Sequence, residues 1–153
     1  MTAEVFKADK MAPLQGICHE FYHNLGGWDL YSYTGSGIAV GPWDIMAEST
    51  SYKIFGLSGF SRSQLGWLTP KKITKSGTYE IDALCSNGRD RLYRIDIPGT
   101  KEYFLIENRF LTGIDSWWQG IPDQGLVIYH TDGAITPTHR FNDGPPRFPH
   151  FAV

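Results

Sequence analysis

Two histidines and a glutamate, His19, Glu20 and His23, form an H-E-x-x-H motif near the start of this chain. Residues four apart on a helix lie on one face, so both imidazoles can reach a single metal ion. Glu20 follows the first histidine and can reach a water molecule on that metal without binding the metal itself. The spacing therefore predicts a hydrolytic zinc (Zn²⁺) site at the end of a helix.

The third metal ligand is expected just after the motif. Gly26 and Gly27 let the chain turn back, so that Asp29, six residues beyond His23, can reach the metal. Two imidazoles and one carboxylate leave a fourth position for water. Glu48 is the alternative, because another class of zinc peptidases takes a glutamate further along the chain as its third ligand. Glu48 follows a loop and has no clear helix around it, so we favour Asp29.

The helix that carries the motif is predicted at residues 14–25. Leu14, Ile17, Phe21 and Leu25 recur at helical spacing, and we expect this stripe to face the core. The two glycines that follow the stripe end the helix, because glycine readily adopts the left-handed conformation of a helix C-terminus.

Two further stretches separate the motif from the rest of the chain. Residues 27–57 are rich in Gly, Ser, Thr and Tyr and are expected to form an irregular loop that a bound metal would constrain. Ser58 is then expected to open a short helix that runs to about Leu65 and is closed by Gly66.

From Thr69 onward the hydrophobic residues alternate with polar ones, as they do in half-buried strands. We therefore expect an α+β fold: the active-site helix, the long irregular loop and the short helix precede an antiparallel β-rich region. Strands are predicted at four positions, namely residues 78–81, 92–97, 102–107 and 125–130, with a turn at 98–101.

Composition narrows the classes of function. The 153 residues carry a net charge of −2, so no basic surface argues for nucleic acid as a partner. Apolar runs are too short for a membrane span, and the first residues show no signal-peptide pattern. Cys18 and Cys85 form no C-x-x-C motif; a disulfide between them and two separate thiols are both compatible with the sequence.

Beyond these motifs, the chain resembles the metzincin clan of zinc endopeptidases, and within it the secreted bacterial metallopeptidases of the immune inhibitor A type. The resemblance covers roughly residues 14–132 and keeps the order of that family's segments. It is carried by the extended motif H-E-x-x-H-x-x-G-x-x-D at residues 19–29, a methionine-turn-like segment at 41–47, a helix and its exit at 57–70, and β-segments at 102–109 and 125–130.

The resemblance implies a role for each residue of the site. His19, His23 and Asp29 would be the zinc ligands, Glu20 the general base, and Met46 a structural support beneath the metal. The implied activity is hydrolysis of peptide bonds in a protein or peptide substrate by an extracellular enzyme. A calcium ion (Ca²⁺) is compatible with a secreted relative, but the sequence identifies no calcium ligands, no substrate-binding residues and no oligomeric state.

The resemblance also implies how the chain is divided. Residues 1–68 would be the C-terminal part of a peptidase catalytic domain and residues 69–153 a sandwich-like, incomplete β-rich domain, in a fragment that lacks the N-terminal subdomain. Two positions depart from the family pattern: Tyr22 replaces a common glycine, and Gly27-Trp28 replaces a common leucine-proline pair. We expect zinc binding to survive both departures.

Two alternatives of other classes remain open. In the first, the chain is a non-catalytic, β-rich binding module in which the zinc is structural or the cleft is incomplete. In the second, the motif is fortuitous and the two histidines lie on the surface at a helix end. Metal content and the number of protein ligands at the site distinguish all three.

Overall fold

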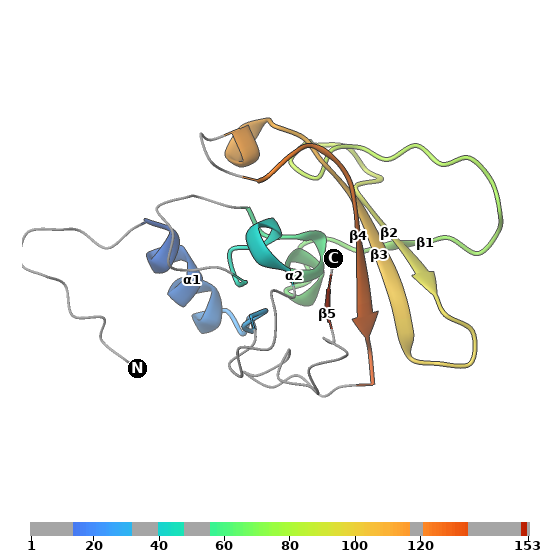
Figure 1. The fold of residues 1–153 in the computed structure, drawn as a ribbon, viewed down its shortest axis with the longest axis horizontal. Coiled ribbons are helices and arrows are strands. Elements are labelled where there is room, and N and C mark those ends of the chain that lie inside the picture. The colour runs from blue at the N-terminus through green and yellow to red at the C-terminus, as the bar shows by residue number, and fades with distance from the viewer. Residues whose placement is uncertain (1–13, 32–39, 48–55, 117–120, 135–150, 153) are drawn as a thin grey trace, which may run out of the picture.

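The computed structural model describes residues 14–31, 40–47, 56–116, 121–134 and 151–152. Helix α2 lies between α1 and a five-stranded sheet, as Figure 1 shows. The elements along the chain are α1 (Leu14–Asn24), the 3-10 turn η1 (Gly41–Trp43), α2 (Gly59–Gln64), β1 (Lys71–Lys72), β2 (Leu92–Asp96), β3 (Glu102–Arg109), the 3-10 turn η2 (Gly113–Ser116), β4 (Gly125–Asp132) and β5 (Phe151–Ala152). This arrangement confirms the α+β fold with a β-rich second half.

The strands follow one another across the sheet in chain order, β1 to β5. The pairs β2–β3, β3–β4 and β4–β5 are antiparallel, and only the two-residue β1 runs parallel to its neighbour. In the register, Arg94, Leu105 and Tyr129 lie opposite one another across β2, β3 and β4. The strands predicted at 92–97, 102–107 and 125–130 are thus confirmed, with β3 and β4 each two residues longer.

The strand predicted at 78–81 is wrong. Residues 73–82 contain no strand, because the free edge of β2 is paired with Lys71 and Lys72 instead. Tyr79 is 40% exposed, packs edge-on against the ring of Tyr93 and donates its hydroxyl to the Lys75 carbonyl oxygen at 2.7 Å. The alternation of polar and apolar residues predicted a strand here, but a strand also needs a neighbouring strand to which its backbone can hydrogen-bond.

The predicted core-facing stripe of α1 is also wrong. Leu14, Ile17, Phe21 and Leu25 are 57, 50, 62 and 43% exposed, whereas the buried residues of α1 are Gln15, His19 and Tyr22. Hydrophobic periodicity therefore placed the helix correctly but assigned its inward side to the wrong face. The polar face is buried because its ring nitrogens and hydroxyl find partners in distant parts of the chain, including Ile45 and Ser61.

Helix α2 begins and ends where the sequence predicted. The Ser58 hydroxyl accepts a hydrogen bond from the Ser61 N–H at 3.3 Å as the N-cap, and Gly66, with φ of 74°, follows the last turn. Among the helices of the described residues, none has the length and apolar character that crossing a membrane requires. Cys18 and Cys85 are both free thiols.

One buried hydrophobic cluster joins the helices to the sheet. It draws on both the 1–68 and the 69–153 ranges, so the two parts share a core; the division at residue 68 stays a prediction. Its fully or nearly fully buried members are Tyr22, Leu30, Val40, Ile45, Met46, Phe60, Leu68, Leu84, Leu92, Leu105, Val127 and Tyr129.

The protein interior also contains a buried guanidinium group, that of Arg109. Arg109, at the end of β3, donates to both carboxylate oxygens of Asp115 at 2.9 and 2.7 Å and to Glu107 Oε1 at 3.0 Å. It also donates to the Trp43 carbonyl oxygen at 2.7 Å, which ties the sheet to η1. Burial alone would lower the pKa of Arg109, but the neighbouring carboxylates outweigh this effect and raise it.

The Glu107 carboxylate connects the same network to two other elements. It accepts hydrogen bonds from the Tyr129 hydroxyl on β4 at 2.7 Å and from the Gly59 N–H at the start of α2 at 2.5 Å. Complete burial raises the pKa of Glu107, although Arg109 and these two donors act against the rise. Glu107 and Arg109 thus form an ion pair within the protein interior.

Replacing Arg109 with methionine is expected to lower the free energy of unfolding by roughly 3–5 kcal/mol, because two buried carboxylates lose their cation. Urea unfolding followed by tryptophan fluorescence measures this loss. The matched control is Lys72→Met, which removes an exposed ion pair with Asp96 and should change stability by less than about 1 kcal/mol. Equal effects of the two substitutions would contradict the central role of Arg109.

Candidate metal centre

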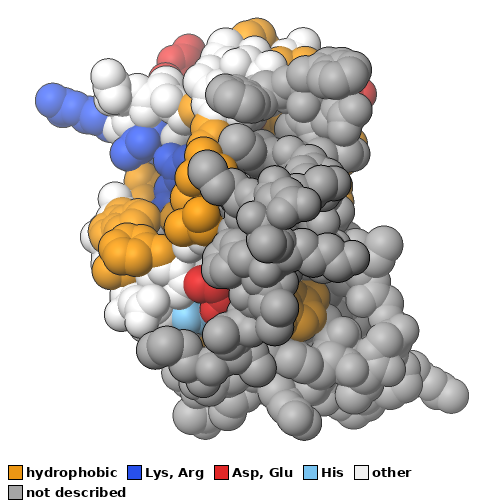
Figure 2. Space-filling model, turned by 90° about the vertical axis from the view of Figure 1, so that its left-hand side faces the viewer, with side chains coloured by type: hydrophobic (Ala, Val, Ile, Leu, Met, Phe, Trp, Pro, Cys, Tyr) orange, Lys and Arg blue, Asp and Glu red, His pale blue; other side chains and the backbone are white. Residues whose placement is uncertain are grey.

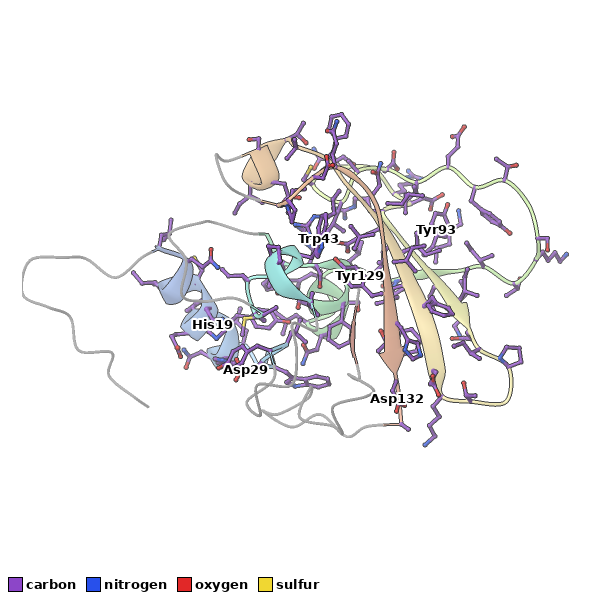
Figure 3. The ribbon with its side chains drawn as sticks, viewed as in Figure 1. His19, Asp29, Trp43, Tyr93, Tyr129 and Asp132 are labelled. Carbon is purple, nitrogen blue, oxygen red and sulfur yellow. The ribbon has the colours of Figure 1, made fainter. Side chains whose placement is uncertain are left out.

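The three predicted ligands converge at the C-terminal half of α1. The Nε2 atoms of His19 and His23 lie 3.2 and 3.0 Å from the same Asp29 oxygen, Oδ1. All three potential ligand atoms lie within 4.8 Å of one another, and the two imidazole rings meet edge to face. His19 and Asp29 lie side by side in Figure 3. This His-His-Asp group could hold a metal ion.

The turn after α1 brings Asp29 to the histidines. Gly26 has φ of 95°, a conformation that residues with a Cβ rarely adopt, and its N–H donates to the His23 carbonyl oxygen at 2.9 Å. One residue beyond Asp29, the Leu30 N–H donates to the Met46 carbonyl oxygen at 2.9 Å. The glycine turn expected from the sequence is thus present, and the loop at 41–47 holds the end of the turn.

Both imidazoles are oriented by backbone carbonyl groups. His19 Nδ1 lies 3.0 Å from the Ile45 oxygen, and His23 Nδ1 lies 3.0 Å from the Gly27 oxygen. A carbonyl oxygen only accepts hydrogen bonds, so each Nδ1 carries the hydrogen, and a ring in its neutral form would direct the lone pair of Nε2 toward Asp29. Either a metal ion or a proton on Nε2 would give the Asp29 carboxylate a favourable partner. A metal-binding histidine is commonly held in this way through its second nitrogen.

Burial makes this arrangement sensitive to charge. The side chains of His19 and Asp29 are 3 and 4% exposed, whereas that of His23 is 22% exposed. Burial works against a charged His19, but the Asp29 carboxylate and the Ile45 carbonyl group together raise its pKa above the ordinary value. A proton on His19 can therefore take the place of a metal ion beside the Asp29 carboxylate. A metal ion and this proton compete for the same position.

Asp44 is a buried residue that the sequence analysis did not identify as part of the site. Its Oδ1 accepts from the Met46 N–H at 2.8 Å, and its Oδ2 accepts from the Ser58 N–H at 2.8 Å and the Ser61 hydroxyl at 2.6 Å. These bonds fix the backbone around Ile45, whose carbonyl oxygen orients His19. In the sequence, Asp44 could have been recognised as the first residue of an Asx-turn, in which an aspartate accepts a hydrogen bond from the N–H two residues further on.

The other predicted site residues occupy different environments. Met46 is fully buried in the hydrophobic cluster, and its part in supporting the metal stays a prediction. Glu20 is exposed, and its charge contributes to raising the pKa of His19, which places the two side chains within electrostatic reach. Its role as general base stays a prediction. Glu48, the alternative ligand, lies outside the described residues.

Tyr22 and Gly27, which both depart from the metzincin pattern, are in direct contact and sterically complementary. A Cβ atom at Gly27 would lie 1.7 Å from the Tyr22 ring, so only glycine leaves room for this tyrosine. The Tyr22 hydroxyl donates to the Ser61 carbonyl oxygen at 2.9 Å, which ties α1 to α2. Gly27 thus leaves room for the Tyr22 ring, and its carbonyl oxygen orients His23.

No family model, curated protein or solved structure matched this chain. The resemblance to metzincins therefore depends on the residues quoted for it. What the structure itself provides is a His-His-Asp group with both rings oriented for metal binding.

Replacing Asp44 with asparagine is expected to weaken zinc binding by about 10–100-fold, the usual effect of removing an outer-shell partner. An asparagine offers one oxygen where three donors need acceptors, so the Ile45 carbonyl group would no longer be fixed. Competition with a chromophoric chelator measures the affinity, with circular dichroism to show that the variant is folded. Asp123→Asn, at an exposed position, should leave the affinity unchanged; a folded Asp44 variant with wild-type affinity would contradict this role.

Proposed function

We propose that this protein is a zinc-dependent endopeptidase in which His19, His23 and Asp29 hold the metal and Glu20 is the general base. The observation that supports it most is the convergence of two oriented Nε2 atoms on one buried carboxylate oxygen. Nitrogen and oxygen ligands in a set of three are typical of catalytic zinc sites, which keep a fourth position for water. The proposal includes a secreted enzyme and protein or peptide substrates.

The chemistry is shared between the ion and the chain. Zinc at this position would acidify water and polarise the scissile carbonyl group. The Glu20 carboxylate, exposed and adjacent to His19 in the helix, would take the proton from the attacking water and pass it to the leaving amine. Asp29 and the two histidines keep their positions through the turn after α1 and the carbonyl oxygens of Ile45 and Gly27.

Access to the site favours a catalytic over a purely structural ion. His23 is partly exposed, so the group opens to solvent on its side of α1 among the described residues. In the space-filling view of this side, a histidine side chain reaches the surface beside acidic side chains (Figure 2). A structural zinc site is usually closed by four protein ligands. The alternative is a non-catalytic binding module, in which the zinc ion would have four protein ligands instead of three.

The proposal predicts one zinc ion per chain and loss of peptide cleavage in Glu20→Gln with zinc retained. The substitution removes the proton acceptor but none of the three ligands, so elemental analysis should give the same zinc content for both proteins. Cleavage of a fluorogenic protein substrate by the metal-loaded protein measures activity. We expect it to fall by at least about 100-fold in the variant.

The control for this experiment is His19→Ala, which should lose both zinc and cleavage. Near-normal turnover by Glu20→Gln would refute the general base. A zinc ion with four protein ligands, seen by X-ray absorption, would favour the binding module. Protein purified without chelator that contains no zinc, and takes up none, would show that the motif is fortuitous.

Zinc affinity is expected to fall as the pH decreases, because both imidazoles must be neutral to bind the metal. The raised pKa of His19 means that protons begin to compete above 6.5, its ordinary value. In the metal-free protein, protonated His19 stabilises the fold at low pH. This stabilisation is lost as the pH rises through the pKa of His19. Chelator competition at several pH values between 5 and 8 measures the change. A zinc affinity that does not change over this pH range would contradict the proposed ligands.

A further inference from the structure

An apolar groove runs along the outer face of α1, away from the metal ligands. Its volume is about 570 Å³, within the range of small-molecule sites. One wall is the exposed stripe of α1, and the space-filling view shows hydrophobic side chains gathered on this side of the molecule (Figure 2). The walls consist mainly of apolar side chains, namely Leu14, Ile17, Phe21 and Leu25 on α1, with Ile45, Leu57, Trp67, Leu68 and Ile114 from the rest of the chain.

Two arginines, Arg62 and Arg91, also line this groove. They lie side by side, because Nη1 of each is directed at the same carbonyl oxygen, that of Leu84, at 3.1 and 3.5 Å. Their other hydrogen bonds also go to backbone carbonyl oxygens, from Arg62 to Leu57 at 3.1 Å and from Arg91 to Ser86 at 3.0 Å. Among the residues that the structure describes, both arginines therefore have hydrogen-bond acceptors but no counter-charge in direct contact.

Arg62 and Arg91 differ from Arg109 in their counter-charges. Arg109 has two carboxylates in contact, whereas neither Arg62 nor Arg91 forms an ion pair within the part of the chain that the structure describes. Burial lowers the pKa of Arg62 most; Glu107 raises it, Arg109 lowers it, Asp115 raises it, and repulsion by Arg91 lowers it by a smaller amount. An anion bound between the two guanidinium groups would relieve this repulsion.

We propose that the groove binds a long-chain fatty acid, with its alkyl chain along the α1 stripe and its carboxylate at Arg62 and Arg91. A guanidinium fork matches the two oxygens of a carboxylate, and two forks side by side offer several donors to one anion. A purely apolar occupant would cover both cations without an anion, which is unfavourable. The ligand must therefore combine an apolar chain with one negatively charged end.

The chemistry of the walls favours an alkyl chain over a polypeptide. A peptide backbone brings N–H and C=O groups that need partners when they are buried. The groove offers few: the Tyr22 hydroxyl already bonds to Ser61, and the backbone of α1 is bonded within its own helix. An alkyl chain has no polar groups to satisfy, so only its carboxylate needs the two arginines.

The experiment uses the full 153-residue chain and stearate brominated along its alkyl chain, below the concentration at which it forms micelles. Bromine quenches nearby tryptophan, and Trp67 lines the groove, so saturable quenching that is lost in Trp67→Phe places the ligand there. Calorimetry with oleate should show one site in the wild type and in Trp67→Phe alike. EDTA should not abolish oleate binding, because none of the three candidate metal ligands lines the groove.

Substitutions then separate the two ends of the ligand. Arg91→Gln should weaken oleate binding by about tenfold and leave binding of oleyl alcohol, which has the same chain without the charge, unchanged. Phe21→Ser, at a position 62% exposed, should fold normally and weaken both ligands. Lys101→Gln, an exposed cation elsewhere, is the matched control and should change neither.

Three results would overturn the proposal. One is the absence of saturable oleate binding, or binding that neither Arg91→Gln nor Phe21→Ser weakens. Another is tight binding of an apolar peptide that oleate does not displace, which would assign the groove to a protein partner. The third is a dimer in analytical ultracentrifugation that Phe21→Ser dissociates and oleate does not, which would assign it to a second copy of the chain.

Discussion

The buried guanidinium of Arg109 connects the sheet to the part of this protein that carries the His-His-Asp group. Its partners are two carboxylates and one carbonyl oxygen, and they come from β3, η2 and η1. Such a group is tolerated in an interior only when each donor has an acceptor and the charge is balanced. Because Arg109 imposes both requirements on segments far apart in the chain, it fixes how the sheet, η1 and η2 are placed relative to one another.

A continuous series of contacts leads from this guanidinium to the metal ligands. Arg109 holds the Trp43 carbonyl oxygen, and the next residue, Asp44, bonds to Met46 and to the start of α2. The Ile45 carbonyl group, between them, orients His19. The direction in which this imidazole presents its lone pair is thus a property of the whole fold, not of α1 alone. This series explains how a small sheet and two short helices can hold a ligand atom in place.

The sequence predicted those features that depend on local geometry. The spacing of His19 and His23 and the glycine turn to Asp29 involve only neighbouring residues, and the structure brings the three ligands together as expected. The inward face of α1 was predicted wrongly, because a hydrophobic stripe shows where a helix runs but not which side the rest of the chain covers. The roles of Asp44 and Arg109 depend on partners distant in the sequence, and one sequence carries no record of such pairs.

The inverted amphipathicity of α1 connects its two faces energetically. The helix has 11 residues, a length at which an isolated helix is marginal in water, so its order depends on contacts with the rest of the protein. Its polar face contributes through His19 and Tyr22, whereas its apolar face is exposed and contributes little. An ion on the polar face and a ligand on the apolar face would both stabilise the same short helix. To the extent that α1 frays without them, each ligand removes part of the ordering entropy that the other must otherwise overcome, which makes their binding mutually reinforcing.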